Sequence, residues 1–171
     1  LTSQLLELGA PLLVALNMSD LARARGLSID TVLLSRLLGA AIVPTVGHKG
    51  QGVEELLDAV VAAAQTPPAR RPGLDYGRDV ERALAVLTPL AALREPASAA
   101  IYGSRWLSVK LLEHDDDARR LVQDAELLAT ADRLAADLER HAGCPPEILI
   151  AEARYGFISG VCREAVKTSA E

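Results

Sequence analysis

The sequence has few of the residues on which several classes of protein depend. Only 3% of its 171 residues are aromatic, and it contains two cysteines, Cys144 and Cys162. Two cysteines are too few for a disulfide framework, so we interpret them as packed thiols of a protein in a reducing compartment. Because aromatic side chains are scarce, leucine, alanine and valine must fill the core, and this composition favours helices.

Long apolar runs and an excess of basic residues are also missing. No apolar stretch approaches the roughly 18 residues that a membrane-spanning helix needs, and no basic segment precedes an apolar one at the start, as in a signal peptide. The net charge of −5, without a Lys/Arg-rich face, argues against nucleic acid as a partner. We therefore expect a soluble segment. Its start at Leu1, in what resembles the end of an amphipathic helix, predicts a fragment.

The first part of the chain alternates between patterns typical of strands and of helices. Two apolar runs, residues 11–16 and 40–46, are typical of buried parallel strands. Between them, Asp30 is placed to cap a helix that ends at Gly39, and residues 53–64 form a further amphipathic helix. Since parallel neighbouring strands need a crossover connection, this order predicts an open α/β sheet covered by helices.

A change of composition divides the chain into two predicted domains. Residues 67–74, rich in proline and glycine, are interpreted as a linker between domains 1–66 and 75–171. The second domain shows helical periods and no convincing strand, which predicts an antiparallel helical bundle and a mainly helical protein overall. The clearest apolar stripe is Leu127, Ala131, Leu134 and Leu138.

Several local features of the bundle are also predicted. Pro89 should kink or restart the first helix, and residues 94–104 should form a loop in which Ser104 caps the next helix. Arg105 should pair with an acidic residue of the bundle, and Trp106 should pack in its core.

The residues that follow the first strand form the candidate binding site. The stretch "LLVALNMSDLA" ends its apolar run in Asn17 and Asp20, at the strand end where open α/β sheets bind ligands. A carboxylate there can accept hydrogen bonds from N1–H and the exocyclic amine of guanine, which adenine cannot supply, while the asparagine amide bonds N7. The loop "TVGHKG" should lie beside it. The pattern fits a guanine reader, but also an ordinary turn or helix cap.

A metal site is a weaker candidate. His141 and Cys144 have a spacing that metal ligands use, and His114 precedes the acidic run Asp115 to Asp117. A soft-ligand site needs three or four converging ligands, whereas only two lie near each other in this sequence. Helix capping and the helix dipole explain the acidic run, so we assign no metal ligand and no catalytic residue.

The whole chain resembles one family. The stretch "LLELGAPLLVALNMSDLARARGLSIDTVLLSRLLGAAIVPTVGHKGQGVEELLDAV" is similar to the second half of the GTP-binding domain of ferrous-iron transport protein B. The helical half agrees independently in "SRWLSVKLLEHD" and "ILIAEARYGFI". The resemblance implies a partial P-loop GTPase-like sheet followed by a helical domain that stabilises the GDP-bound state and links the nucleotide switch to a membrane channel.

The resemblance also implies which residues contact the base of GTP or GDP. Asn17 and Asp20 match the base-recognition motif, with Met18 in the place where most small GTPases have lysine. The last nucleotide loop is matched by Val46, Gly47 and His48.

Some parts of a GTPase are missing from this sequence. No stretch matches G-x-x-x-x-G-K-[ST], the loop that holds the phosphates and Mg²⁺, and no switch threonine or D-x-x-G segment is found. We therefore expect the chain to be inactive alone, with Mg²⁺ bound only in the intact domain. The expected partners are the missing N-terminal half of the GTPase domain and the channel, on the cytoplasmic side of a bacterial inner membrane.

Two other functions stay open. The chain is alternatively a standalone helical protein-interaction module whose α/β half binds no nucleotide, or, less favourably, a complete small enzyme of other specificity. If the amino-terminal half is absent, exposed strand edges and apolar helix faces predict association with another copy or partial unfolding.

Overall fold

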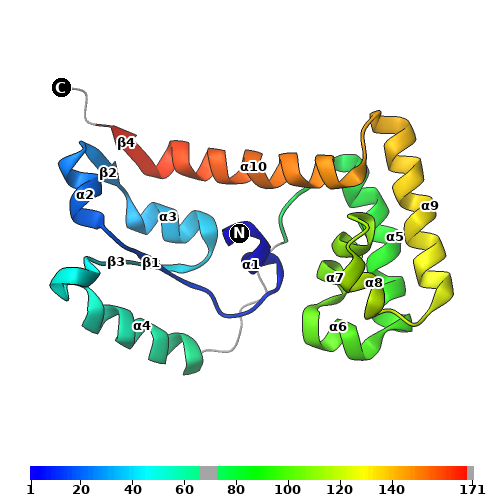
Figure 1. Ribbon diagram of the computed structural model, residues 1–171, viewed down its shortest axis with the longest axis horizontal. Helices are drawn as coiled ribbons and strands as arrows, with labels where there is room; N and C mark the ends of the chain where they lie inside the picture. Colours follow the sequence, from blue (N-terminus) through cyan, green and yellow to red (C-terminus); the bar gives the residue numbers. More distant parts are fainter. Residues whose placement is uncertain (66–72, 169–171) are drawn as a thin grey trace. The chain divides into compact units, whose positions relative to one another are not determined.

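The computed structural model describes residues 1–65 and 73–168 (Figure 1). They form two compact units. The α/β unit contains residues 1–65 and 157–168, and the helical unit contains residues 73–156. Helices predominate, and a small parallel sheet lies near the start of the chain, which confirms the predicted fold class. Most of the predicted linker lies outside the described residues.

The α/β unit is built on two parallel strands, as predicted. β1 and β3 pair in a register that sets Leu13 opposite Ala41 and Leu16 opposite Pro44. Helices α3 and α4 lie on opposite faces of this pair (Figure 1). The elements of this part of the chain are α1 (Thr2–Glu7), β1 (Leu13–Leu16), α2 (Ser19–Ala24), β2 (Leu27–Ile29), α3 (Thr31–Leu38), β3 (Ala41–Pro44), the 3₁₀ turn η1 (Gly47–Lys49) and α4 (Val53–Gln65).

The ends of α3 confirm the signals read from the sequence. The Leu33 N–H donates to Asp30 Oδ1 at 2.9 Å, so Asp30 is the N-cap, and Gly39 follows the last helical residue. The apolar side of α3 then faces a small core in which Leu38 and Ala40 are buried. Capping at both ends places the helix so that its buried side meets the sheet.

A second, antiparallel pair of strands was not predicted. β2 pairs with β4 (Val166–Thr168), with Leu27 opposite Thr168 (Figure 1). The Asp30 N–H also donates to the Ala165 carbonyl at 2.8 Å. Each strand has three residues, too few for a recognisable period of two, so the expectation of no strand after the linker was wrong.

The end of the chain therefore groups with the α/β unit. Val161, on the second half of α10 (Pro146–Ala165), is buried in the core that contains Leu38 and Ala40. The predicted helical domain ran to residue 171, whereas residues 157–168 lie in the α/β unit. One long helix supplies apolar residues to two separate cores, and the helix continues through Gly156, where one unit ends.

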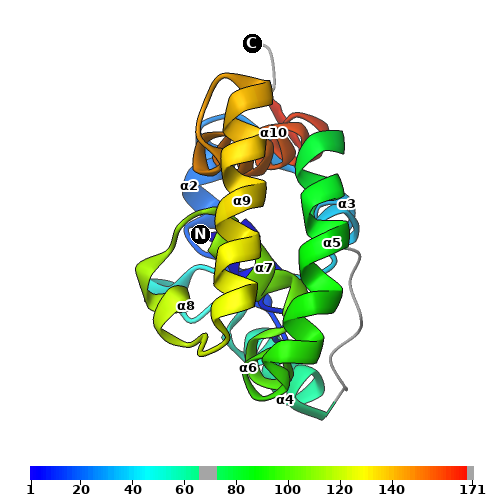
Figure 2. The same ribbon diagram turned by 90° about the vertical axis from the view of Figure 1, so that its right-hand side faces the viewer.

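The helical unit is the predicted bundle. Helices α5, α7 and α9 lie side by side and enclose its core (Figure 2). Leu84, Leu87, Leu107, Leu111 and Leu127 are fully buried there. The helices of this unit are α5 (Arg78–Arg94), α6 (Pro96–Tyr102), α7 (Ser104–Leu112), α8 (Asp116–Arg120), α9 (Ala125–Ala142) and the first part of α10.

The structure corrects local predictions for the bundle at three places. Helix α5 does not restart at Pro89, while a kink there stays a prediction, and the predicted loop contains helix α6, with Pro96 in its first turn. Ser104 is the first residue of α7, and Gly103 is its N-cap without a side-chain cap bond. Leu87 and Ala91 are fully buried on either side of Pro89, so packing of α5 outweighs the hydrogen bond that proline removes.

Two side chains of α7 behave as predicted. The guanidinium of Arg105 donates to both carboxylate oxygens of Glu81, at 3.0 and 2.7 Å. Trp106 packs against the bundle core and stacks on Tyr102 with ring centroids 5.1 Å apart. In the described residues, no single helix is long and apolar enough to cross a membrane; α5 and α6 reach that length only together, bent by 114°.

Candidate functional site

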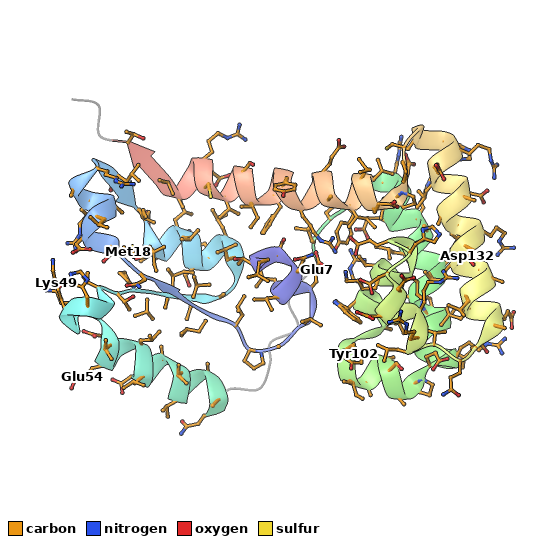
Figure 3. All side chains as sticks on the ribbon, in the orientation of Figure 1. Glu7, Met18, Lys49, Glu54, Tyr102 and Asp132 are labelled. Atoms are coloured by element: carbon orange, nitrogen blue, oxygen red, sulfur yellow. The ribbon has the colours of Figure 1, made fainter. Side chains whose placement is uncertain are left out.

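The loops that follow β1 and β3 meet at the carboxyl end of the parallel strands. The Thr45 N–H donates to the Leu16 carbonyl at 3.0 Å, and the Ser19 N–H donates to the Thr45 carbonyl at 3.2 Å. Figure 3 labels Met18 and Lys49, which lie at this end of the α/β unit. The two sequence segments proposed for base recognition are therefore neighbours in space.

Asn17 joins the two loops through one atom. Its Oδ1 accepts the Gly47 N–H at 3.1 Å, the Met18 N–H at 2.9 Å and the Thr45 hydroxyl at 3.4 Å. The Nδ2 group, by contrast, has no hydrogen-bond acceptor among the described residues. The amide thus uses its acceptor to hold the two loops, and its donor is not used by the described residues.

Asp20 lies in the first turn of α2 and turns its carboxylate toward the loop after β3. Its Oδ2 is 2.7 Å from Lys49 Nζ, and its Oδ1 accepts the Leu21 N–H at 3.0 Å. The Lys49 hydrogen bond lowers the pKa of the Asp20 carboxyl below its usual value, so the group is ionised at neutral pH. The carboxylate does not point into the protein interior, since a quarter of the side chain is exposed.

Met18 has an unusual backbone conformation at the start of α2. Its φ is 58°, in the left-handed region, and its side chain is 58% exposed. A methionine side chain is unbranched and polarisable, and it lies here on the surface beside Asn17.

The turn after β3 is built around a buried side chain. Val46 is 1% exposed, and its N–H donates to the Gln51 carbonyl at 2.9 Å, which closes the turn. Gly47 and His48 form the exposed rim of the turn. The Val46 side chain is thus buried and both of its backbone polar groups are bonded within the loop, since its carbonyl accepts the Lys49 N–H at 2.9 Å, whereas Gly47 and His48 face outward.

Lys49 is the residue of this site that sequence reasoning missed. It belongs to no phosphate-loop motif, yet its ammonium group lies 2.7 Å from Asp20 Oδ2. The two residues are 29 positions apart, and no local pattern links them. Only the pairing of β1 with β3 brings them together.

The weaker metal candidates do not assemble. No group of three or more His, Cys, Asp or Glu side chains that could hold a metal ion is found in the described residues. His141 Nδ1 lies 2.6 Å from the carbonyl of Asp137, one turn earlier in α9. Asp115 caps α8 by accepting the Ala118 N–H at 3.0 Å, as the sequence predicted.

Two family models together match most of the chain. The family model of ferrous iron transport protein B matches residues 1–60, and the model of the FeoB cytosolic helical domain matches residues 76–167. The chain belongs to the ferrous iron transport protein B family. The helical-domain match ends one residue before β4 does, so the family domain includes the part of α10 that packs in the α/β unit.

Relatives and solved structures of FeoB proteins cover nearly all of the chain. It is 34% identical to the Fe(2+) transport protein A/Fe(2+) transporter FeoB fusion protein of Porphyromonas gingivalis over 99% of its length, and 33% identical to the Fe(2+) transporter FeoB of Shigella flexneri over 95%. It spans 21% and 20% of these two relatives.

Among solved structures, a GDP-bound mutant of S. thermophilus NFeoB matches with a TM-score of 0.85 at 27% identity. This match covers 98% of the present chain and 63% of that one. The cytosolic domain of L. pneumophila FeoB matches with a TM-score of 0.73 at 30% identity, covering 98% and 62%.

Proposed function

We propose that this chain is the guanine-recognising and helical part of the cytosolic region of a bacterial ferrous-iron transporter. Asn17, Met18 and Asp20, together with the loop of Val46, Gly47 and His48, would contact the base of GTP or GDP. The observation that carries the proposal is the bond from the Gly47 N–H to Asn17 Oδ1, because it places both loops at one edge.

The donors and acceptors of the site match those of guanine. The Asn17 amide keeps its N–H donor for N7, and the ionised Asp20 carboxylate accepts from N1–H and the exocyclic amine. The exposed thioether of Met18 is placed to cover the ring. Adenine has an acceptor where guanine has N1–H, so it would meet the carboxylate with like polarity.

Hydrolysis of GTP requires parts that these 171 residues do not contain. The sequence has no phosphate-loop motif, so the phosphates and Mg²⁺ would be held by the rest of the G domain. This proposal is supported by the solved FeoB structures, of which the chain covers 63% in the GDP-bound example. The chain alone would bind the base weakly and would not turn over GTP.

The helical unit would couple nucleotide state to transport. The match to the FeoB cytosolic helical domain supports this role, and coupling would act through a two-state element biased by the bound nucleotide. The intact protein would then place both units on the cytoplasmic side of the inner membrane, next to its channel.

Titration with GDP and ADP tests the base site directly. The ¹⁵N-labelled chain should show amide shifts at residues 17–20 and 46–49 with GDP, and much weaker ones with ADP. Asp20→Asn should weaken GDP binding at least about tenfold, because two charge-assisted hydrogen bonds are impaired. Asp58→Asn, on the exposed side of α4, is the matched control and should leave binding unchanged.

The alternative of a protein-interaction module predicts a different result. It expects no GDP-dependent shifts in any variant. The exposed apolar side chains of α4 favour contact with another copy or with another protein. The association expected from the sequence stays a prediction. These side chains are Val53, Leu57, Val60 and Val61, which are 38–59% exposed.

A further inference from the structure

Both oxygens of the Asp20 carboxylate already have donors in the structure. Oδ2 is 2.7 Å from Lys49 Nζ, and Oδ1 accepts the Leu21 N–H at 3.0 Å. The Leu21 bond is local and keeps the carboxylate oriented at the start of α2. The Lys49 bond comes from the other loop, and the side chains of Lys49 and Asp20 are 50% and 25% exposed. The ion pair therefore lies where a ligand of Asp20 would arrive.

We propose that Lys49 competes with guanine for the carboxylate of Asp20 and thereby sets the affinity of the base site. The inference rests on the proposed function, since it assigns a role at that same site. Guanine presents two adjacent N–H donors to a carboxylate, one to each oxygen. Each carboxylate oxygen has two lone pairs, so the Leu21 N–H leaves room for a second donor on Oδ1. The bulkier ammonium of Lys49 lies beside Oδ2, where it competes with a guanine N–H for the same side of the carboxylate.

The backbone around the pair shows which side moves. The Lys49 N–H donates to the Val46 carbonyl at 2.9 Å within η1, and Val46 is buried. Asp20 is fixed in α2 by its bond from Leu21. Both backbones are thus held, and the long lysine side chain is the part with freedom to swing out. Asn17 uses different atoms, so its contact with Gly47 persists while Lys49 leaves.

Competition of this kind lowers the apparent affinity by the fraction of molecules in which the carboxylate is free. An exposed ion pair is weak, so the Asp20 carboxylate is free of Lys49 in a sizeable fraction of molecules. This fraction corresponds to an affinity for guanine that is about two- to fivefold lower than without the competition. The same pair is screened by salt, whereas the hydrogen bonds from a neutral base are affected much less. Lys49 therefore acts through Asp20, and its effect on guanine affinity should depend on ionic strength.

Guanosine is the probe of choice because it is uncharged and tests the base site without the phosphates. Its binding to the full chain is followed by ¹⁵N amide shifts at residues 17–20, at low and high salt. Lys49→Gln should bind guanosine about two- to fivefold more tightly than the unmodified chain at low salt. Raising the salt from about 0.05 to 0.5 M should tighten binding to the unmodified chain and leave Lys49→Gln nearly unchanged.

Lys167→Gln removes the same charge from exposed β4 and should behave like the unmodified chain. The proposal is overturned if Lys49→Gln binds guanosine equally or more weakly, or if its salt response matches that of the unmodified chain. Asp20→Asn separates the two levels of inference. If guanosine binding depends on Asp20 but not on Lys49, only the competition is refuted; if no variant binds guanosine, the base site fails and the role of Lys49 fails with it.

Discussion

The glycines of the loop after β3 allow a sharp test of how this loop is held. Gly52 has a φ of +75°, and a Cβ added there would lie 2.2 Å from the Pro44 carbonyl oxygen at the end of β3. Gly50 has a similar φ of +67°, but an added Cβ would have no atom within 4 Å. The pair therefore separates the cost of a left-handed conformation from the cost of a backbone clash.

The expected magnitudes follow from this geometry. Gly50→Ala should lower the free energy of unfolding by about 1 kcal/mol, because a left-handed alanine costs roughly 1–2 kcal/mol and the stiffer unfolded chain returns part of it. Gly52→Ala carries the same strain plus an overlap with backbone that cannot rotate away, which adds about 1–3 kcal/mol. We expect a total loss of about 2–4 kcal/mol.

Gly47 completes the series as a control. Its φ lies outside the left-handed region, and an added Cβ would meet Asn17 Oδ1 at 3.6 Å, an ordinary contact. Gly47→Ala should therefore change stability by less than about 1 kcal/mol, and the reduced freedom of the unfolded chain favours the folded state.

The assay must report on the α/β unit alone. The single tryptophan, Trp106, lies in the helical unit, so its fluorescence during urea unfolding should be the same in all three variants. Hydrogen exchange of the Thr45 amide, which donates to the Leu16 carbonyl between the strands, follows the α/β unit. Equal exchange rates in Gly50→Ala and Gly52→Ala would refute the role assigned to the contact between Gly52 and Pro44.

Two further predictions concern the helical unit. Arg154 and Glu113 form an ion pair with side chains only 10% and 11% exposed, and Lys110 lies 3.2 Å from the same carboxylate. Arg154→Met should lower the free energy of unfolding, measured with urea, by about 3 kcal/mol. A loss below about 0.5 kcal/mol would contradict this prediction. The Ala118 N–H lowers the pKa of the Asp115 carboxyl below its usual 3.8. The stabilisation of the folded state by the ionised carboxylate is therefore present above that value and is lost as the pH falls through the folded-state pKa. Asp115→Asn should accordingly destabilise the protein at pH 7 and have a smaller effect near pH 2; equal effects at both pH values would argue against it.

Signals that lie close together in the sequence predicted the structure well. Asp30 and Gly39 marked both ends of α3, and the two apolar runs became β1 and β3. Asp115 capped α8 for the same reason. Such signals depend on caps and on hydrophobic patterns within a few neighbouring residues, so they can be recognised without knowledge of tertiary contacts.

Predictions failed where packing opposed a local preference. Pro89 disfavours a continuous helix, but α5 continues because Leu87 and Ala91 are buried beside it. β2 and β4 are too short to be recognised and are stabilised by each other, from opposite ends of the chain. These outcomes are set by burial and by long-range pairing, which local patterns do not contain.

The same distinction applies to the candidate site. The sequence alone predicted β1, α3, β3 and α4 in this order and placed an amide and a carboxylate after β1, because hydrophobic periodicity and strand ends are local properties. Only the tertiary structure decided that Asn17 accepts from Gly47 and that Asp20 faces Lys49. The physical reason is that the parallel pairing of β1 and β3 brings together two loops about thirty residues apart in the chain. Hydrogen bonds and charge interactions depend on the distance between atoms in space and not on their separation in the sequence.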